Sequence, residues 1–151
     1  MKQAGRQTIL LIEDSDEDYV ATDRAFKKCG YNLQLKRAEN ADQALDFLLN
    51  RGTSKANKSK NAVPSLILLD LNLPGLDGRD FLLQLKRDER LKEIPVVILT
   101  TSDNPQDVLH CYRNGANGYQ LKVVGFEKFY NSIKSMILYW FETATIPSAV
   151  N

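Results

Sequence analysis

Five short apolar segments occur along the chain, separated by longer polar or mixed stretches. Three of them are rich in aliphatic residues and do not alternate with polar ones: residues 8–12 (TILLI), 66–69 (LILL) and 95–99 (PVVIL). This pattern is typical of strands that are buried on both faces, and such strands belong to parallel sheets. Residues 33–36 (LQLK) and 118–121 (GYQL) are two weaker strand candidates. We therefore predict a parallel sheet of five strands.

A helical pattern follows each of these segments. Apolar residues recur at helical spacing after Asn40, whose side chain suits the N-cap position, at Ala41, Ala44, Leu45, Leu48 and Leu49. That helix is expected to run to about residue 50. Similar patterns predict helices at residues 16–29, 78–87, 105–113 and 126–141. Strands that alternate with helices through right-handed crossovers predict an α/β fold, with a doubly wound five-stranded parallel sheet as the middle of three αβα layers.

One polar insert interrupts this alternation. Residues 51–64 (RGTSKANKSKNAVP) carry basic side chains and no acidic one. We interpret the segment as a solvated loop before the third strand, with a small basic docking patch as the alternative. Because no aromatic residues are interleaved with these basic ones, the segment does not predict a nucleic-acid groove.

Length and composition fit one globular domain. The chain has 151 residues, of which 43% are hydrophobic and 26% are charged, and its net charge is +1. We expect a single domain over residues 1–151, with its core at about 8–141 and a short tail at 142–151. The balanced charge gives no overall attraction to nucleic acid or membranes. No apolar stretch is long enough to span a bilayer or to act as a signal peptide, so a cytoplasmic protein is expected.

The two cysteines and the one histidine carry little functional signal. Cys29 and Cys111 lie far apart without paired spacing, which favours reduced thiols in helices over a disulfide or a metal site. His110 precedes Cys111, and one such neighbour is more often incidental than a catalytic pair.

The polar residues that follow the predicted strands are the main candidates for chemistry. Glu13 and Asp14 follow the first strand, Asp70 the third, Thr100 ends the fourth, and Lys122 follows the fifth. Taken singly, each has an ordinary explanation as a helix-start acid, a turn cap, a β-former or a surface charge. Together they lie at the carboxyl ends of parallel strands, where ligands bind in open α/β sheets.

This acidic group requires positive charge. Two carboxylates about 4 Å apart repel each other by roughly 4 kcal/mol at an effective dielectric constant near 20. Lys122 supplies one compensating charge. A hard divalent ion would supply the rest, and Mg²⁺ suits a site with few carboxylates, a backbone carbonyl and retained waters.

The motifs LLIED, LILLDLNLPGLDG, IPVVILTTS, GANGY and LK occur in this order along the chain. In this combination the sequence resembles the receiver domains of bacterial two-component response regulators, from residue 9 to about residue 140. More narrowly, the chain resembles the single-domain regulators paired with cyanobacterial phytochromes. This resemblance rests on the segments DLNLPGLDGR and IPVVILTTSD, on the polar insert and on the aromatic last helix. The resemblance implies the flavodoxin-like receiver fold.

The resemblance also implies a reaction at Asp70. This carboxylate would take a phosphoryl group from the histidine of a sensor kinase, which the narrower resemblance implies is of the phytochrome type. Asp14, Asp70 and the backbone carbonyl of Asn72 would bind Mg²⁺, and Glu13 would reach the ion through water. The protein would then be a signalling switch that binds partners, and not an enzyme for an external substrate.

Three further residues acquire roles by the same resemblance. Lys122 would neutralise charge on the phosphoryl oxygens, and Thr100 would donate its hydroxyl to one of them. The movement of Thr100 would let Tyr119 turn inward, so that these two residues form the switch. Receivers usually follow the lysine with a proline in a cis peptide bond, but here Val123 stands in that position. The Lys122–Val123 bond is then either cis, or trans with a different approach of the lysine.

Two other functions remain open. A magnesium-dependent phosphatase could form an aspartyl-phosphate, but such enzymes typically place a second carboxylate two residues after the nucleophile, where this chain has Asn72. A receiver-like adapter could signal without phosphorylation, and Val123 is the feature that supports it.

The last helix has more apolar surface than one sheet face needs. Besides its main stripe, Leu138, Tyr139 and Phe141 form a second face. An excess of this kind often marks an association surface, so we expect a homodimer through the last two helices. The alternative is that the tail at 142–151 folds back over these aromatic residues.

Overall fold

The computed structural model describes residues 6–50 and 63–147, and in this part of the chain strands and helices alternate as the sequence predicts. Of the polar insert, only Val63 and Pro64 fall within the described residues. The elements are β1 (Gln7–Ile12), α1 (Asp16–Cys29), β2 (Leu33–Ala38), α2 (Ala41–Leu48), β3 (Leu66–Leu69), α3 (Gly78–Arg87), β4 (Val96–Thr100), α4 (Pro105–Arg113), β5 (Gly118–Leu121) and α5 (Phe126–Leu138), followed by the π-helical turn η1 (Tyr139–Thr143).

The predicted parallel sheet is confirmed. Its strand order is β2-β1-β3-β4-β5, and every neighbouring pair is parallel. The order reverses at β1, because β2 lies on one side of it and β3 on the other. In open sheets such a switch point is where ligands bind. The carboxyl ends of β1 and β3 therefore meet side by side at the edge that carries the candidate residues.

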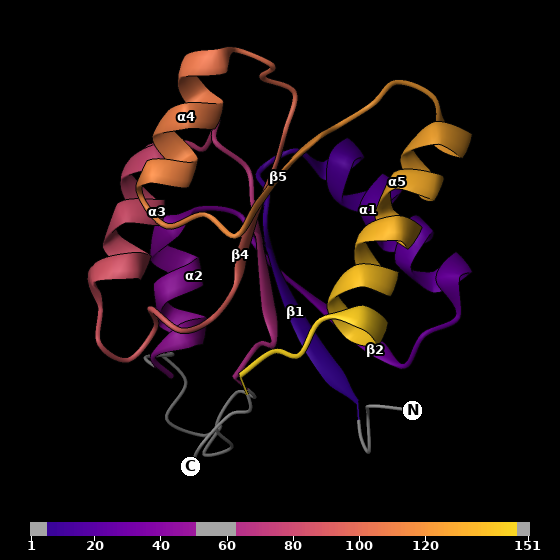
Figure 1. The fold of residues 1–151 in the computed structure, drawn as a ribbon, viewed down its shortest axis with the longest axis horizontal. Coiled ribbons are helices and arrows are strands. Elements are labelled where there is room, and N and C mark those ends of the chain that lie inside the picture. The colour runs from indigo at the N-terminus through magenta and orange to yellow at the C-terminus, as the bar shows by residue number, and fades with distance from the viewer. Residues whose placement is uncertain (1–5, 51–62, 148–151) are drawn as a thin grey trace.

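Helices cover both faces of the sheet. In Figure 1, α2, α3 and α4 lie on one face, whereas α1 and α5 lie on the other. Successive residues of β1 pack alternately into the two layers: Leu10 and Ile12 join the core beneath α2, α3 and α4, and Ile9 and Leu11 join the core beneath α1 and α5. Both faces of the central strands are thus apolar, which explains why their sequences do not alternate.

Local capping sets the ends of the helices. The Ser15 side chain accepts a hydrogen bond from the N–H of Asp18 at the start of α1, and Gly30 ends that helix in the left-handed conformation with φ +76°. The Asn40 side chain caps α2 as predicted. This helix ends at Leu48, slightly before the expected residue 50. Asn50 has a positive φ of 55°, which is incompatible with a right-handed helix.

The end of the last helix differs from the prediction. The α-helix stops at Leu138 and continues as the π-helical turn η1, in which the N–H of Ala144 donates to the carbonyl of Tyr139 at 2.6 Å. Phe141 lies in this turn and is buried, with an exposed fraction of 3%, on the same side as Ile133 and Ile137. Placing Phe141 on a second, outward face was therefore wrong. Leu138 and Tyr139 are exposed, and Ile146 of the tail packs against the core beneath α1 and α5.

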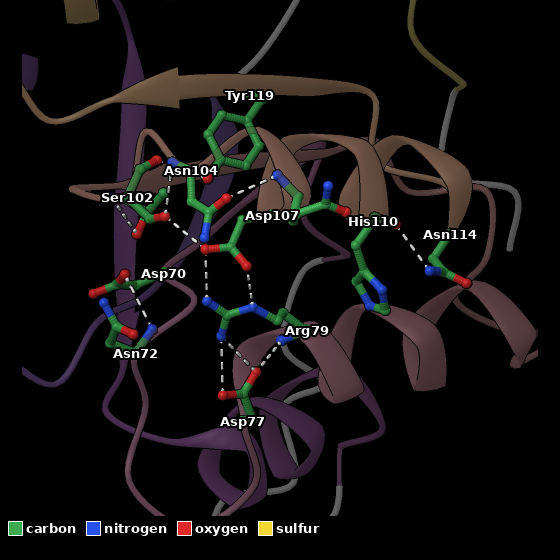
Figure 2. Close-up of polar contacts among 12 residues, drawn as sticks. Asp70, Asn72, Asp77, Arg79, Ser102, Asn104, Asp107, His110, Asn114 and Tyr119 are labelled. Carbon is green, nitrogen blue, oxygen red and sulfur yellow. Dashed lines mark hydrogen bonds and ion pairs between the residues drawn. The ribbon is translucent and has the colours of Figure 1, made fainter.

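Arg79 links the starts of α3 and α4. Its Nε and Nη2 donate to the two carboxylate oxygens of Asp107 at 2.7 and 2.9 Å, and its Nη1 donates to Asp77 at 3.0 Å (Figure 2). The Ser102 hydroxyl donates to the same Asp107 at 2.6 Å. Hydrogen bonds from Arg79 and then from Ser102 lower the pKa of Asp107 to about 2. We call these four residues, Asp77, Arg79, Ser102 and Asp107, the Arg79 clasp.

Gly78 allows α3 to begin directly against the loop after β3. Its N–H donates to the carbonyl of Leu71 at 2.9 Å. A Cβ at this position would lie 2.3 Å from the carbonyl oxygen of Asp70 and 2.6 Å from the Cα of Leu71. Both are backbone atoms, so only glycine fits without moving the loop that carries Asp70.

None of the helices within residues 6–50 and 63–147 combines the length and the apolar character that crossing a membrane requires.

We predict that Gly78→Ala lowers the free energy of unfolding by about 1–3 kcal/mol, because the added methyl group displaces the loop after β3. The measurement is urea denaturation followed by circular dichroism. Gly118→Ala is the control, since a Cβ there would lie 3.4 Å from the nearest atom of Val97, an ordinary contact. Equal stability of the two variants would contradict this account of Gly78.

We predict that the Arg79 clasp makes stability depend on pH. The lowered pKa of Asp107 means that its contribution is complete above the unfolded pKa, near 4, and is lost as the pH falls toward 2. Asp107→Asn should lower the free energy of unfolding by about 1.5–3 kcal/mol at neutral pH, and this difference from the wild type should shrink between pH 4 and pH 2. Denaturant titrations at a series of pH values measure it.

The control for this titration is Asp103→Asn, which removes the same charge from an exposed position in the loop just before α4. Its difference from the wild type should stay within about 0.5 kcal/mol at every pH. A pH-independent difference for Asp107→Asn would show that the clasp is not the origin of the effect.

Candidate functional site

Three carboxylates meet at the carboxyl ends of β1 and β3. Glu13, Asp14 and Asp70 each place an oxygen within 4.8 Å of the others. Backbone hydrogen bonds extend the sheet just past the strands, from the N–H of Glu13 to Ala38 at 2.9 Å and from the N–H of Asp70 to Ile12 at 3.1 Å. The exposed fractions of Glu13 and Asp70 are 1% and 5%, whereas Asp14 is exposed. The sheet therefore fixes two buried acids next to one that faces solvent.

Lys122 brings positive charge to this cluster from the end of β5. Its Nζ donates to Glu13 Oε1 at 2.5 Å, to Asp18 Oδ2 at 2.8 Å and to Asp70 Oδ2 at 3.1 Å. Burial alone would lower the pKa of Lys122, but the hydrogen bonds to Asp18 and Glu13 raise it above its ordinary value. Lys122 is thus a charged ammonium in the pocket.

Burial has the opposite effect on the partner acid. It raises the pKa of Glu13 to about 7, with a further increase from the charge of Asp70, and the hydrogen bond from Lys122 only partly offsets this. The charged form of Glu13 is therefore costly at this position, and a second cation would stabilise it.

The Lys122–Val123 peptide bond is trans, since the described residues contain no cis peptide bond. With this geometry the Lys122 ammonium still reaches Asp70. Of the two arrangements that the sequence leaves open, the trans bond with its own approach of the lysine is the one in the structure.

The donor set of the cluster fits a divalent cation. Its three members are oxygen ligands, two of which are buried where uncompensated charge is costly. Asn72 follows at the edge of the cluster, where its N–H donates to Asp70 Oδ1 at 3.3 Å. This contact keeps the backbone of Asn72 beside Asp70.

Thr100 and Tyr119 are connected through the loop after β4. Thr100 is fully buried, and its hydroxyl oxygen accepts a hydrogen bond from the N–H of Ser102 at 3.4 Å. The Tyr119 hydroxyl donates to the carbonyl of Ser102 at 2.8 Å, and burial raises the pKa of this phenol. Figure 2 shows Tyr119 beside the loop that carries Ser102 and Asn104. Both predicted switch residues therefore contact the segment that also enters the Arg79 clasp.

Sequence reasoning missed Asp18 and the Arg79 clasp. Asp18 lies in the acidic run EDSDED, where nothing separates it from its neighbours as a partner for Lys122, 104 residues away. Arg79 and Asp107 are 28 residues apart, and no local pattern joins them. The cysteines behave as predicted: both are free thiols, and burial raises the pKa of Cys111 to about 11. His110 is exposed.

Comparisons with known sequences agree with this geometry. A family model described as the response regulator receiver domain matches residues 9–134. The probable methanogenesis regulatory protein FilR2 of Methanothrix harundinacea is 37% identical over 133 residues, which cover 87% of this chain and 82% of FilR2. The response regulator Rcp1 of Synechocystis sp. is 36% identical over 143 residues, or 95% of each chain.

Solved structures lead to the same family. The crystal structure of the phosphorylated cyanobacterial phytochrome response regulator RcpA matches with a TM-score of 0.85 and 35% identity, over 95% of this chain and 100% of that one. The Mn²⁺-bound form of Rcp1 matches with a TM-score of 0.83 and 35% identity, over 94% and 99% of the two chains. The chain thus belongs to the response regulator receiver domains of two-component systems.

Proposed function

We propose that this chain is a phosphoacceptor switch that receives a phosphoryl group on Asp70 from the histidine of a sensor kinase. The observation that carries the proposal is the buried Asp70 carboxylate at the switch point of the sheet. It accepts a hydrogen bond from the Lys122 ammonium and lies beside two further acids, Glu13 and Asp14. In the reaction an Asp70 oxygen bonds to phosphorus, the phosphorus–nitrogen bond of the phosphohistidine breaks, and the imidazole leaves. The product is an acyl phosphate on Asp70.

Mg²⁺ is the proposed cofactor. Asp14, Asp70 and the backbone carbonyl of Asn72 would bind it, with Glu13 reaching it through water. The ion would supply neutralisation of the charge on the transferred oxygens, which is the main catalytic need of phosphoryl transfer. Support comes from the oxygen donors that already converge here and from the relative Rcp1, whose structure is known in a Mn²⁺-bound form.

The chain's own residues perform the rest of the step. Lys122 pairs with a phosphoryl oxygen while it remains within reach of Asp70, and Thr100 donates its hydroxyl to another. Thr100 must then shift with the loop after β4, and through Ser102 this movement reaches both Tyr119 and Asp107. The Arg79 clasp would carry the change to α3 and α4. The signal is then phosphorylation-dependent protein binding.

A phytochrome-type kinase is the proposed upstream partner. The argument is the similarity to RcpA, a cyanobacterial phytochrome response regulator, and to Rcp1 over nearly the whole chain. The adapter alternative is weaker than the sequence suggests, because the trans bond before Val123 leaves Lys122 within 3.1 Å of Asp70. Position 72 still lacks the acid that the phosphatase alternative needs.

We expect the wild-type protein to gain one phosphoryl group when it is incubated with acetyl phosphate and Mg²⁺. Asp70→Asn should gain none, because the amide lacks the nucleophilic oxygen, and a chelator should abolish labelling of the wild type. Intact mass spectrometry measures all three.

Asp80→Asn is the matched control for this labelling, since it removes an exposed acid from the first turn of α3. It should be labelled at the wild-type rate. A folded wild-type protein that gains no phosphoryl group would reject the phosphoacceptor proposal in favour of the adapter.

A homodimer through α4, β5 and α5 is a second part of the proposal. The edge strand β5 lies between these helices (Figure 1). Large apolar side chains are exposed on all three elements and on the turn that follows α5: Leu109, Tyr112, Leu121, Leu138 and Tyr139. Exposed apolar groups over neighbouring elements are typical of an association surface.

We predict that the wild-type protein sediments as a dimer at high micromolar concentration and that Tyr112→Glu sediments as a monomer, because a charge would be buried in the interface. Val20→Glu is the control, since Val20 is exposed on α1, outside α4, β5 and α5. A wild-type monomer, both with and without beryllofluoride as a phosphoryl mimic, would reject the dimer.

A further inference from the structure

We propose that Asp18 is a positioning residue for phosphoryl transfer: it holds the Lys122 ammonium beside Asp70 from outside the metal cluster. This inference rests on the proposed function, because Lys122 acts on the phosphoryl group. Asp18 does not touch the reacting atoms itself. It would act through its 2.8 Å contact with Lys122 Nζ.

Three carboxylates match the three protons of the ammonium. Lys122 Nζ has Glu13, Asp18 and Asp70 as its acceptors, so each of its N–H groups has a partner. The Lys122 side chain is flexible along its stem and would otherwise have many positions of similar energy. With three acceptors, one just after β1, one just after β3 and one in α1, the ammonium has one defined place as long as no cation occupies the acidic cluster.

The ordinary role of an acid at position 18 is already filled by another residue. Ser15 caps α1, and an acid three residues later usually accepts a hydrogen bond from the cap's own N–H. Here that N–H donates to Glu13 Oε2 at 3.2 Å. The Asp18 carboxylate is turned to Lys122 instead, so helix capping does not account for its position.

The backbone of Asp18 is fixed on both sides. Its N–H donates to the Ser15 hydroxyl at 3.2 Å, and its carbonyl accepts a hydrogen bond from the Thr22 hydroxyl at 2.8 Å. An acid on a fixed backbone is a better anchor for Lys122 than one on a mobile loop. Its side chain is 44% exposed, compared with 7% for Asp70, so the Asp18 carboxylate keeps contact with solvent while it accepts from Lys122.

Asp18 differs from the other two acceptors because it is not part of the acidic cluster that fits a cation. Glu13 and Asp70 belong to the acidic cluster that fits a cation, whereas Asp18 lies outside it. A cation drawn to Glu13 and Asp70 weakens their hold on the ammonium. Asp18 then remains as its partner, and Lys122 can yield space to the ion without leaving the pocket.

Open space lies beside the pair. A cavity of about 200 Å³ has Asp18 and Lys122 among its lining residues, together with Phe126 and Phe129 of α5. The contact between Asp18 and Lys122 is therefore at the border of the packed core.

The test compares the wild type with Asp18→Asn in two measurements. The first is the rate of labelling by acetyl phosphate with saturating Mg²⁺, which we expect to fall by about tenfold, as for a misplaced electrostatic group. The second is Mg²⁺ affinity by isothermal titration calorimetry, which needs no phosphoryl transfer. Affinity should fall by about fivefold, because the ammonium then competes with the ion for Glu13 and Asp70.

Two further sets of variants show whether Asp18 acts through Lys122. Glu17→Gln removes an exposed acid from the same helical turn and should leave both measurements within about twofold of the wild type. In a Lys122→Met background, adding Asp18→Asn should change neither Mg²⁺ affinity nor the residual labelling rate further. Asp18→Glu, which keeps the charge, should restore most of the wild-type behaviour.

The inference is overturned if Asp18→Asn behaves as the wild type in Mg²⁺ affinity, or if its effect on affinity persists unchanged in the Lys122→Met background. A wild-type protein that binds Mg²⁺ but accepts no phosphoryl group would reject the proposed function alone. The calorimetric measurements would still decide whether Asp18 positions Lys122.

Discussion

The site depends on the electrostatic balance between buried carboxylates and one lysine. Glu13 and Asp70 lie almost entirely out of solvent, and Asp14 is close to both. The strand order places Lys122 two strands away from Asp70, with β4 between them, a separation of about 10 Å. Only a long side chain can bridge that distance. The Lys122 side chain extends from β5 past the end of β4, where Thr100 is buried, to reach Asp70. The fold therefore creates the repulsion at β1 and β3 and supplies its counterion from β5.

The same sheet edge is connected to α3 and α4 through a closed set of contacts. Gly78 is the first residue of α3 and packs against the loop that carries Asp70. The next residue, Arg79, donates hydrogen bonds to Asp107 in the first turn of α4. Asp107 in turn accepts a hydrogen bond from Ser102, whose backbone N–H contacts Thr100. Hydrogen bonds and adjacent backbone thus connect the loop after β3 with the start of α4 and with the loop after β4.

The sequence predicted what depends on local chemistry and burial. The non-alternating runs identified the central strands, and the side chain of Asn40 caps α2 as expected. Glu13, Asp14 and Asp70 lie together with Lys122, because parallel strands share one carboxyl edge. Two details at the end of the last helix differed from the prediction. The α-helix changes to a π-helical turn after Leu138, which no local pattern indicated. Phe141 is buried, and its spacing of four and eight residues from Ile137 and Ile133 already fitted the main apolar stripe.

The position of Lys122 illustrates a different limit of sequence reasoning. The residue after the lysine is Val123, and the trans bond between them places no special constraint on the backbone. Lys122 is instead located by the acceptors of its ammonium, one of which comes from the first turn of α1. A side chain can exchange one contact for another without any movement of the sheet. A constraint on the backbone cannot be changed without moving the strand that carries it. The position of the lysine ammonium therefore depends on side-chain contacts, whereas the position of β5 depends on its pairing with β4.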